Sequence, residues 1–237
     1  MSTAVKSKPA FYLIALLIPV VLLLVVEMGL RIFDYGKTIP AFIPVKEAPG
    51  YLQPNPKLIQ RYFSRPESAP NVSPDTVYFN RHKPHDTFRI VIKGGSRAAG
   101  FPYGRFGSLQ GMLQQRFKNA YPDKNIEIIN TAMAAVNTFT LIDIQKEILA
   151  LKPDAVLVYA GHNEYLGVLG AGSVLGGKGS YGATLLYLKL KSLRLFQLVE
   201  SLTLGLFDSF DSHTDPDAAN QKPQQALQAR STMAKAA

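Results

Sequence analysis

The sequence predicts an α/β domain with a mostly parallel sheet, preceded by one N-terminal transmembrane helix. The first observation is a block from Phe11 to Val26 in which every residue is apolar, aromatic or Pro. The second is an alternation of short β-branched runs with amphipathic helical segments between Phe88 and Tyr159. Because this alternation is typical of parallel strands joined by right-handed crossovers, we expect a layered α/β structure.

The apolar block is long enough to cross a bilayer. A helix rises about 1.5 Å per residue and needs roughly 20 residues to span the hydrocarbon layer, so residues 9–32 are the expected span. Lys6 and Lys8 place residues 1–8 in the cytoplasm by the positive-inside rule. A cleaved signal peptide is the alternative, but no small-x-small cleavage site follows the block. We therefore expect an uncleaved signal anchor in the inner (cytoplasmic) membrane, single-pass, with the soluble domain on the periplasmic or extracellular side.

The remaining chain divides by composition into three parts. Residues 33–86 are rich in Pro and lack a sustained period, which predicts a linker. Residues 87–206 contain the predicted α/β domain, and residues 207–237 form a polar tail. Within the domain, strands are expected at 88–93, 126–129 and 155–159, and helices at 109–117 and 141–149.

Two segments after the third strand allow more than one interpretation. Residues 167–183 contain seven glycines and form either a mobile loop near the site or a poorly fixed connection. Residues 185–204 form a leucine-rich helix with basic residues, which either packs on the sheet or binds the membrane surface.

Composition restricts the chemistry. The chain has no cysteine, which excludes disulfides, thiolate nucleophiles and cysteine metal sites. Its four histidines show no metal-ligand spacing, so we expect neither a metal nor a cofactor. The formal net charge is +9, but without a nucleic-acid-binding module this charge is more typical of a protein near an anionic membrane surface.

The predicted strands end in polar or glycine-rich turns, and the carboxyl ends of strands build the sites of open α/β sheets. The turns at Ser96, Asn130–Asn137 and Gly161–Glu164 should therefore converge. Gly94-Gly95-Ser96 either exposes a serine nucleophile or cradles a phosphate, although neither Gly-x-Ser-x-Gly nor Gly-Lys-Ser/Thr is present. Asn163 is either a neutral donor for an oxyanion or a turn residue that caps the next helix.

Taken in order, these turns resemble the sequence blocks of the SGNH (GDSL-like) hydrolase superfamily. Gly94-Gly95-Ser96 is similar to the first block, Gly-Asp-Ser, and Asn130–Ala135 occupies the second. Gly161-His162-Asn163-Glu164 is similar to the third block, Gly-x-Asn-Asp/Glu. The residues around the first block also resemble a bacterial membrane-anchored subgroup. The resemblance covers about residues 61–204 and implies a three-layer, flavodoxin-like fold.

The resemblance also implies roles for single residues. Ser96 is the nucleophile, and its backbone N–H is the first oxyanion donor. The side chain of Asn163 is another donor. Ala135 stands where the family has a glycine whose N–H is the remaining donor, and its Cβ disfavours positive φ. The neighbouring residues expected to contact the substrate are Gly95, Arg97, His162 and Glu164.

The family's general base, a histidine in an Asp-x-x-His block, is not found. The only histidine beyond the third block is His213, and the residue three before it is Phe210. His162, next to Asn163, is a candidate substitute for the base that a serine nucleophile needs. A truncated gene product is the simplest explanation of the missing block.

Two functions from different classes are therefore open. The first is a serine esterase or O-acyl-transfer enzyme outside the cytoplasmic membrane, acting on a small-molecule, glycan or lipid ester. The second is a catalytically impaired binding or scaffolding module tethered to the membrane. Both have the membrane as a partner and neither has nucleic acid, and the sequence does not identify a protein partner or the acyl group.

Overall fold

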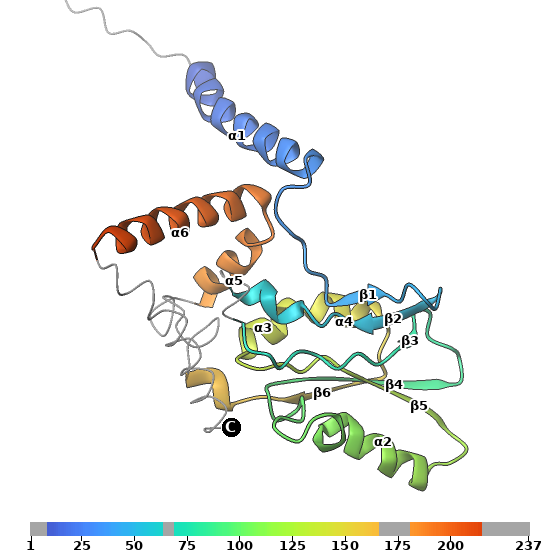
Figure 1. Cartoon of the computed structure of the whole chain (residues 1–237). Helices are drawn as coiled ribbons and strands as arrows, with labels where there is room; N and C mark the ends of the chain where they lie inside the picture. Colours follow the sequence, from blue (N-terminus) through green and yellow to red (C-terminus); the bar gives the residue numbers. More distant parts are fainter. Residues whose placement is uncertain (1–8, 64–68, 166–180, 215–237) are drawn as a thin grey trace, which may run out of the picture. The chain divides into compact units, whose positions relative to one another are not determined.

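The computed structural model describes residues 9–63, 69–165 and 181–214 (Figure 1). The expected cytoplasmic residues 1–8, most of the glycine-rich segment 167–183 and most of the polar tail 207–237 lie outside the described residues. The chain forms two compact units, one of Met1–Thr38 with Leu188–Phe210 and one of Ile39–Tyr187 with Asp211–Ala237.

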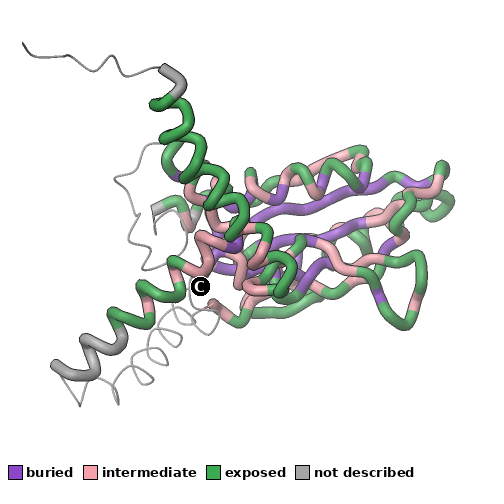
Figure 2. Tube along the Cα trace, turned by 90° about the horizontal axis from the view of Figure 1, so that it is seen from above, coloured by how far each residue is buried: buried purple, intermediate pink, exposed green. Residues whose placement is uncertain are grey.

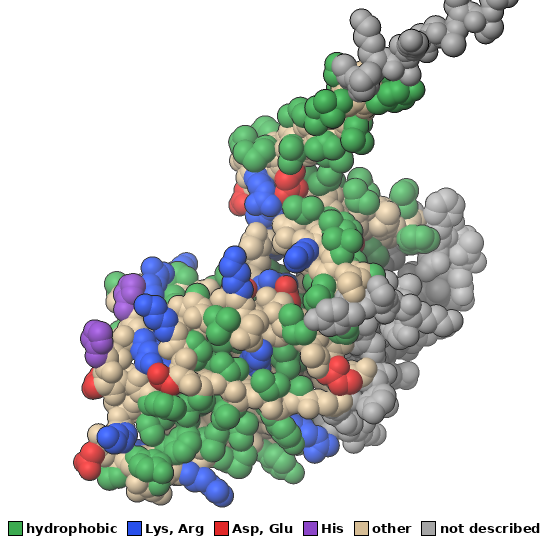
Figure 3. Space-filling model, turned by 180° about the vertical axis from the view of Figure 1, so that it is seen from behind, with side chains coloured by type: hydrophobic (Ala, Val, Ile, Leu, Met, Phe, Trp, Pro, Cys, Tyr) green, Lys and Arg blue, Asp and Glu red, His purple; other side chains and the backbone are tan. Residues whose placement is uncertain are grey.

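The first unit begins with helix α1, Pro9–Ile32, whose bounds are those predicted for the span. Within the part of the chain that the structure describes, it is the one helix long and apolar enough to cross a membrane. Its segment Phe11–Ile32 has a mean hydropathy of 2.8 and is not buried by the rest of the protein. Apolar side chains accordingly cover its surface in the upper part of Figure 3. Pro19 lies inside the helix, as transmembrane helices allow.

The leucine-rich segment 185–204 forms two helices instead of the single predicted one. Helix α5, Tyr181–Leu190, ends in a turn closed by hydrogen bonds from Ser192 and Leu193 to the carbonyls of Lys189 and Leu190. Helix α6, Arg194–Thr214, follows. The segment Leu188–Phe210 belongs to the same compact unit as α1 and not to the unit of the sheet, where residues up to 206 were expected.

The second unit is built on a parallel sheet, as predicted. Strands β4 (Thr87–Gly94), β5 (Asn125–Asn130) and β6 (Ala155–Tyr159) lie in the order β5-β4-β6, and both pairs are parallel. The central strand β4 is buried along most of its length (Figure 2). A strand covered on both faces is typical of parallel sheets, because their crossovers place helices on the faces.

Helices cover the two faces of this sheet (Figure 1). Helix α2, Leu109–Ala120, packs its apolar side chains against Ile90, Ile92 and Ile128 on one face. Successive side chains of a strand point to opposite faces, so Lys93 points away from the face of Ile90 and Ile92. Its side chain bonds to residues of α3 (Thr138–Asp143) and α4 (Gln145–Ala150) on the other face. The helix predicted at 141–149 is thus two short helices.

Much of the segment 33–86, predicted as a linker, is folded into the second unit. Strands β1 (Phe42–Pro44), β2 (Tyr51–Pro54) and β3 (Phe79–Asn80) form an antiparallel sheet in that order. The 3-10 helix η1, Leu58–Tyr62, buries Leu58, Ile59 and Tyr62. These elements are too short to show a sequence period, which explains why the sequence pattern predicted a linker.

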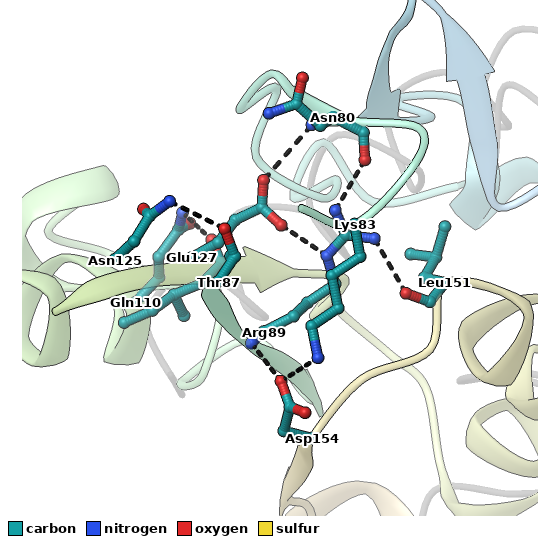
Figure 4. Close-up of polar contacts among 10 residues, drawn as sticks. Asn80, Lys83, Thr87, Arg89, Gln110, Asn125, Glu127, Leu151 and Asp154 are labelled. Carbon is teal, nitrogen blue, oxygen red and sulfur yellow. Dashed lines mark hydrogen bonds and ion pairs between the residues drawn. The ribbon is translucent and has the colours of Figure 1, made fainter. Parts of the chain in front are cut away.

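A buried arginine connects the start of β4 to three neighbouring segments (Figure 4). Arg89 is completely buried, and its guanidinium donates to Glu127 Oε2 at 2.5 Å, to the Leu151 carbonyl at 2.8 Å and to the Asn80 carbonyl at 2.7 Å. Its backbone N–H donates to Asp154 at 2.7 Å. A buried charge is tolerated only when it is paired and hydrogen-bonded, and Arg89 satisfies both conditions.

Candidate functional site

Three turns meet at the carboxyl ends of the parallel strands. The N–H of Gly95, after β4, donates to the carbonyl of Tyr159 at the end of β6 at 3.2 Å. The N–H of Met133, after β5, donates to the carbonyl of Gly94 at 3.1 Å. The turn after β4 therefore lies between the other two, as expected for a site at the carboxyl edge of a parallel sheet.

Ser96 begins the tight turn that leaves β4. This turn requires glycine at position 94, because a Cβ there would lie 2.3 Å from the Tyr159 carbonyl oxygen and 2.6 Å from the Ala98 Cβ. The carbonyl of Ser96 accepts the N–H of Phe101 at 3.0 Å, which closes the turn. Ser96 is half-buried and the following Arg97 is exposed.

The backbone N–H of Ser96 donates to no other described residue. The same holds, within the described residues, for the N–H of Ala135 in the turn after β5. Unused N–H groups at a strand-end turn are the donors from which oxyanion holes are built. Their roles as oxyanion donors stay predictions.

Asn163 lies in the short 3-10 helix η4, His162–Tyr165, after β6. Its Nδ2 donates to the carbonyl of Val136 at 3.0 Å, which connects the third turn to the second. The same nitrogen would be 3.3 Å from a Cβ at Gly95, so the amide lies beside the residue that precedes Ser96. An amide nitrogen carries two N–H groups, and the second one has no partner within the described residues.

Ala135 adopts the backbone conformation that glycine favours. Its φ is +53°, in the left-handed region, where an L residue costs roughly 1–2 kcal/mol. The preceding Ala134 is held by a hydrogen bond from its N–H to the carbonyl of Val72 at 2.9 Å. Ala135 therefore has positive φ although it carries the Cβ that a glycine at this position would lack.

Glu164 connects the third turn to the start of α3. Its Oε1 accepts from both the backbone N–H and the hydroxyl of Thr138, each at 2.8 Å. The carboxylate thus connects two turns of the fold, and its expected contact with a substrate stays a prediction. The side chains of His162 and His213, the histidines considered as base, lie outside the described residues.

Sequence reasoning assigned no role to two buried polar side chains below the site. Asn130, at the end of β5, donates from Nδ2 to the carbonyl of Ala98 at 3.1 Å and accepts the N–H of Ala132 at 3.0 Å. It therefore positions the turn that contains Ser96. The available signal was an asparagine that directly follows the strand predicted at 126–129.

Lys93 is the second such residue and lies three positions before Ser96. Its ammonium donates to the Leu141 carbonyl at 3.2 Å and to the side-chain oxygen of Gln145. Burial lowers the pKa of this lysine, because the charged form loses hydration. In the sequence, the only signal of this role was a lysine inside the β-branched run of β4. In the structure, its side chain fixes α3 and α4 against the sheet.

The site contains no acid-base partner for the serine within the described side chains. The Ser96 hydroxyl makes no hydrogen bond to a described residue. In the same part of the chain, no group of three or more His, Cys, Asp or Glu side chains could hold a metal ion. What the arrangement offers is a half-buried serine in a tight turn, with the amide of Asn163 beside the preceding Gly95.

Comparisons with protein-family models, with curated proteins and with solved structures found no match. The fold and the site therefore define the class of protein only as a mixed α/β protein with a parallel three-stranded sheet and an N-terminal apolar helix.

Proposed function

We propose that the protein is a membrane-anchored serine hydrolase of the SGNH type, with a three-layer flavodoxin-like domain that acts on ester bonds by hydrolysis or O-acyl transfer. One observation supports this function most directly. The turn after the central strand presents Ser96 with an unused backbone N–H, and the amide of Asn163 lies beside the preceding Gly95. A nucleophile and neutral donors at one strand end are two of the three parts that acyl transfer by a serine requires, and a general base is the third.

In the proposed reaction, Ser96 Oγ attacks the ester carbonyl and the C–O bond to the alcohol breaks, leaving an acyl-serine. Water, or a second alcohol in the transfer reaction, then attacks the acyl group and releases the serine. The negative oxygen of each tetrahedral intermediate is stabilised by the N–H groups of Ser96 and Ala135 and by the second N–H of Asn163. His162 is the proposed base that takes the Ser96 proton and returns it to the leaving alcohol.

Helix α1 is the proposed membrane anchor. Its length, its exposed apolar surface and the lysines at positions 6 and 8 support a single span with the N-terminus in the cytoplasm. The hydrolase domain then faces the periplasm or the extracellular side of the inner membrane. Its substrate class is an ester of a small molecule, a glycan or a lipid.

One observation favours a second function, a membrane-tethered binding module without turnover. No described side chain accepts a hydrogen bond from the Ser96 hydroxyl, and an unactivated serine is a weak nucleophile. Such a module would use the same N–H donors to bind an anionic or carbonyl group, with no covalent step.

A serine-directed probe separates the two functions. Full-length protein in detergent is incubated with a fluorophosphonate probe and with p-nitrophenyl acetate, beside Ser96→Ala and the control Ser192→Ala. Ser192 is exposed and bonds only to the nearby Lys189 carbonyl, so its loss changes no part of the site. Labelling and turnover that vanish only in Ser96→Ala support the hydrolase. Equal turnover in all three proteins, with no labelling, contradicts it.

A further inference from the structure

Helix α6 begins against the C-terminal part of α1. The carboxylate of Glu27, inside α1, accepts the backbone N–H of Arg194 at 3.1 Å and that of Leu195 at 2.8 Å. The first N–H groups of a helix have no partner within it, and the helix dipole favours an acidic group there. A residue of the apolar helix itself therefore fixes the start of α6.

The next turns of α6 contact the residues that directly follow α1. Gln197 exchanges two hydrogen bonds with the backbone of Lys37, at 2.9 Å and 3.1 Å. The hydroxyls of Tyr35 and Ser201 are 2.9 Å apart. Gln197 and Ser201 are four residues apart, on one face of the helix. That face of α6 is bound to the chain where it has just left the apolar span.

The opposite face of α6 is apolar and exposed. Val199, Leu202 and Leu206 are spaced by three and four residues, which places them in one stripe. Their exposed fractions are 51%, 59% and 62%, so the whole stripe is open to solvent. A contiguous exposed apolar surface of this kind marks a binding site for another apolar surface.

Basic side chains gather where α6 meets α1. The first unit has five of them near this junction, against three acidic ones: Arg31, Lys37, Lys189, Lys191 and Arg194, and Glu27, Asp34 and Glu200. Arg31 and Lys191 form ion pairs with Glu27 and Glu200, and Arg194 is buried. The exposed cations of this set that have no ion pair within the described residues are therefore Lys37 and Lys189. Excess positive charge beside an apolar stripe is typical of helices that bind anionic lipid surfaces.

We propose that α6 lies on the surface of the membrane that α1 spans, with the stripe of Val199, Leu202 and Leu206 inserted at the boundary between headgroups and acyl chains. This inference rests on α1 being a transmembrane anchor but not on hydrolase activity. Residues 35 and 37 follow the span on its aqueous side. The face of α6 that binds them therefore faces water, and the stripe on the opposite side faces the bilayer.

The absence of cysteine makes a site-specific test simple. Single cysteines are introduced as Leu202→Cys and Leu206→Cys, with Ser201→Cys as an exposed control on the opposite face of the helix. Leu22→Cys, in the middle of α1, reports on the span. Each full-length variant is labelled with the fluorophore NBD and reconstituted in phosphatidylethanolamine and phosphatidylglycerol vesicles. Some vesicles contain lipid with a spin label near the headgroup end of the acyl chain, which is a shallow quencher. Others contain lipid with the spin label near the terminal methyl group of the chain, which is a deep quencher.

An interfacial helix inserts its apolar face roughly 5–10 Å below the headgroup level, so the shallow quencher should act about twofold more strongly at 202 and 206 than at 201. Equal quenching at the three positions, or blue-shifted emission at 202 without quenching, would overturn the proposal. The latter result would mean that a second copy or the sheet unit covers the stripe. A label at position 22 that escapes the deep quencher would instead show that α1 does not span, which removes the anchor and the inference together.

Discussion

The side-chain amide of Asn163 donates a hydrogen bond to the backbone carbonyl of Val136. The distance from Asn163 Nδ2 to the carbonyl oxygen is 3.0 Å. This bond fixes the amide beside Gly95, and no described residue accepts its second N–H. A donor held in this way does not have to reorganise when charge develops on a substrate oxygen, which is the condition for electrostatic stabilisation of a transition state.

If the protein is the proposed hydrolase, replacing Asn163 with Asp should reduce kcat about 10²–10³-fold, because the carboxylate has the same shape but no N–H donor. The rate of p-nitrophenyl acetate hydrolysis measures this, beside the Ser96→Ala variant as the zero. A rate within a few-fold of the wild type would remove Asn163 from the oxyanion site. Thermal unfolding of the variant shows whether the loss of the Val136 contact has changed the fold.

Gly94→Ala should destabilise the protein by about 1–3 kcal/mol, the usual cost of overpacking, because the new Cβ would meet the Tyr159 carbonyl oxygen between β4 and β6. Urea unfolding of detergent-solubilised protein, followed by circular dichroism, measures the change. Gly182→Ala is the matched control, since nothing lies within 4 Å of a Cβ at that position of α5. A Gly94→Ala variant as stable as the control would contradict the close approach of the two strands.

Ala135→Gly should stabilise the protein by about 1 kcal/mol, because glycine adopts positive φ without the strain that alanine has at +53°. The same unfolding measurement detects the gain. Ala132→Gly is a suitable comparison, since Ala132 has no positive φ and should lose stability when its buried methyl group is removed. A loss at both positions would mean that Ala135 is not strained.

Arg89→Met should cost about 3–5 kcal/mol, because it leaves the Glu127 carboxylate and two carbonyls without their buried partner. The control Arg116→Met changes an exposed arginine of α2 and should leave stability nearly unchanged. Adding Glu127→Leu to Arg89→Met should recover part of the loss, since the unpaired charge is then removed. No recovery in the double variant would show that the ion pair is not the source of the effect.

The buried Lys93 predicts a pH dependence of stability. Its pKa is lowered in the folded protein, so above that pKa the unfolded chain binds more protons than the folded one. The free energy of unfolding should then rise with pH until the ordinary pKa of lysine is passed. Comparing wild type with Lys93→Met between roughly pH 8 and pH 10 isolates this contribution, which the methionine variant lacks. A difference between the two proteins that does not change with pH would contradict it.

The local sequence was enough to predict the helices and strands that show a clear hydrophobic pattern. The bounds of α1 followed from an apolar block and the length that a bilayer requires, and β4, β5 and β6 followed from short β-branched runs ending in turns. The meeting of those turns could also be predicted, because parallel strands bring their carboxyl ends to one edge. The roles of Ser96, Asn163 and Ala135 remain predictions that the geometry supports.

Only the tertiary structure decided how distant segments satisfy each other's polar groups. Glu27 binds the N–H of Leu195, 168 residues later in the chain, and this contact assigns α6 to the unit of α1. Asn130 and Lys93 likewise have partners in other elements, so neither role is visible in the residues around them. The physical reason is that periodicity records which side of an element is buried. The partner of a buried hydrogen-bonding group depends instead on which elements pack together, and the chain specifies that only when it is folded.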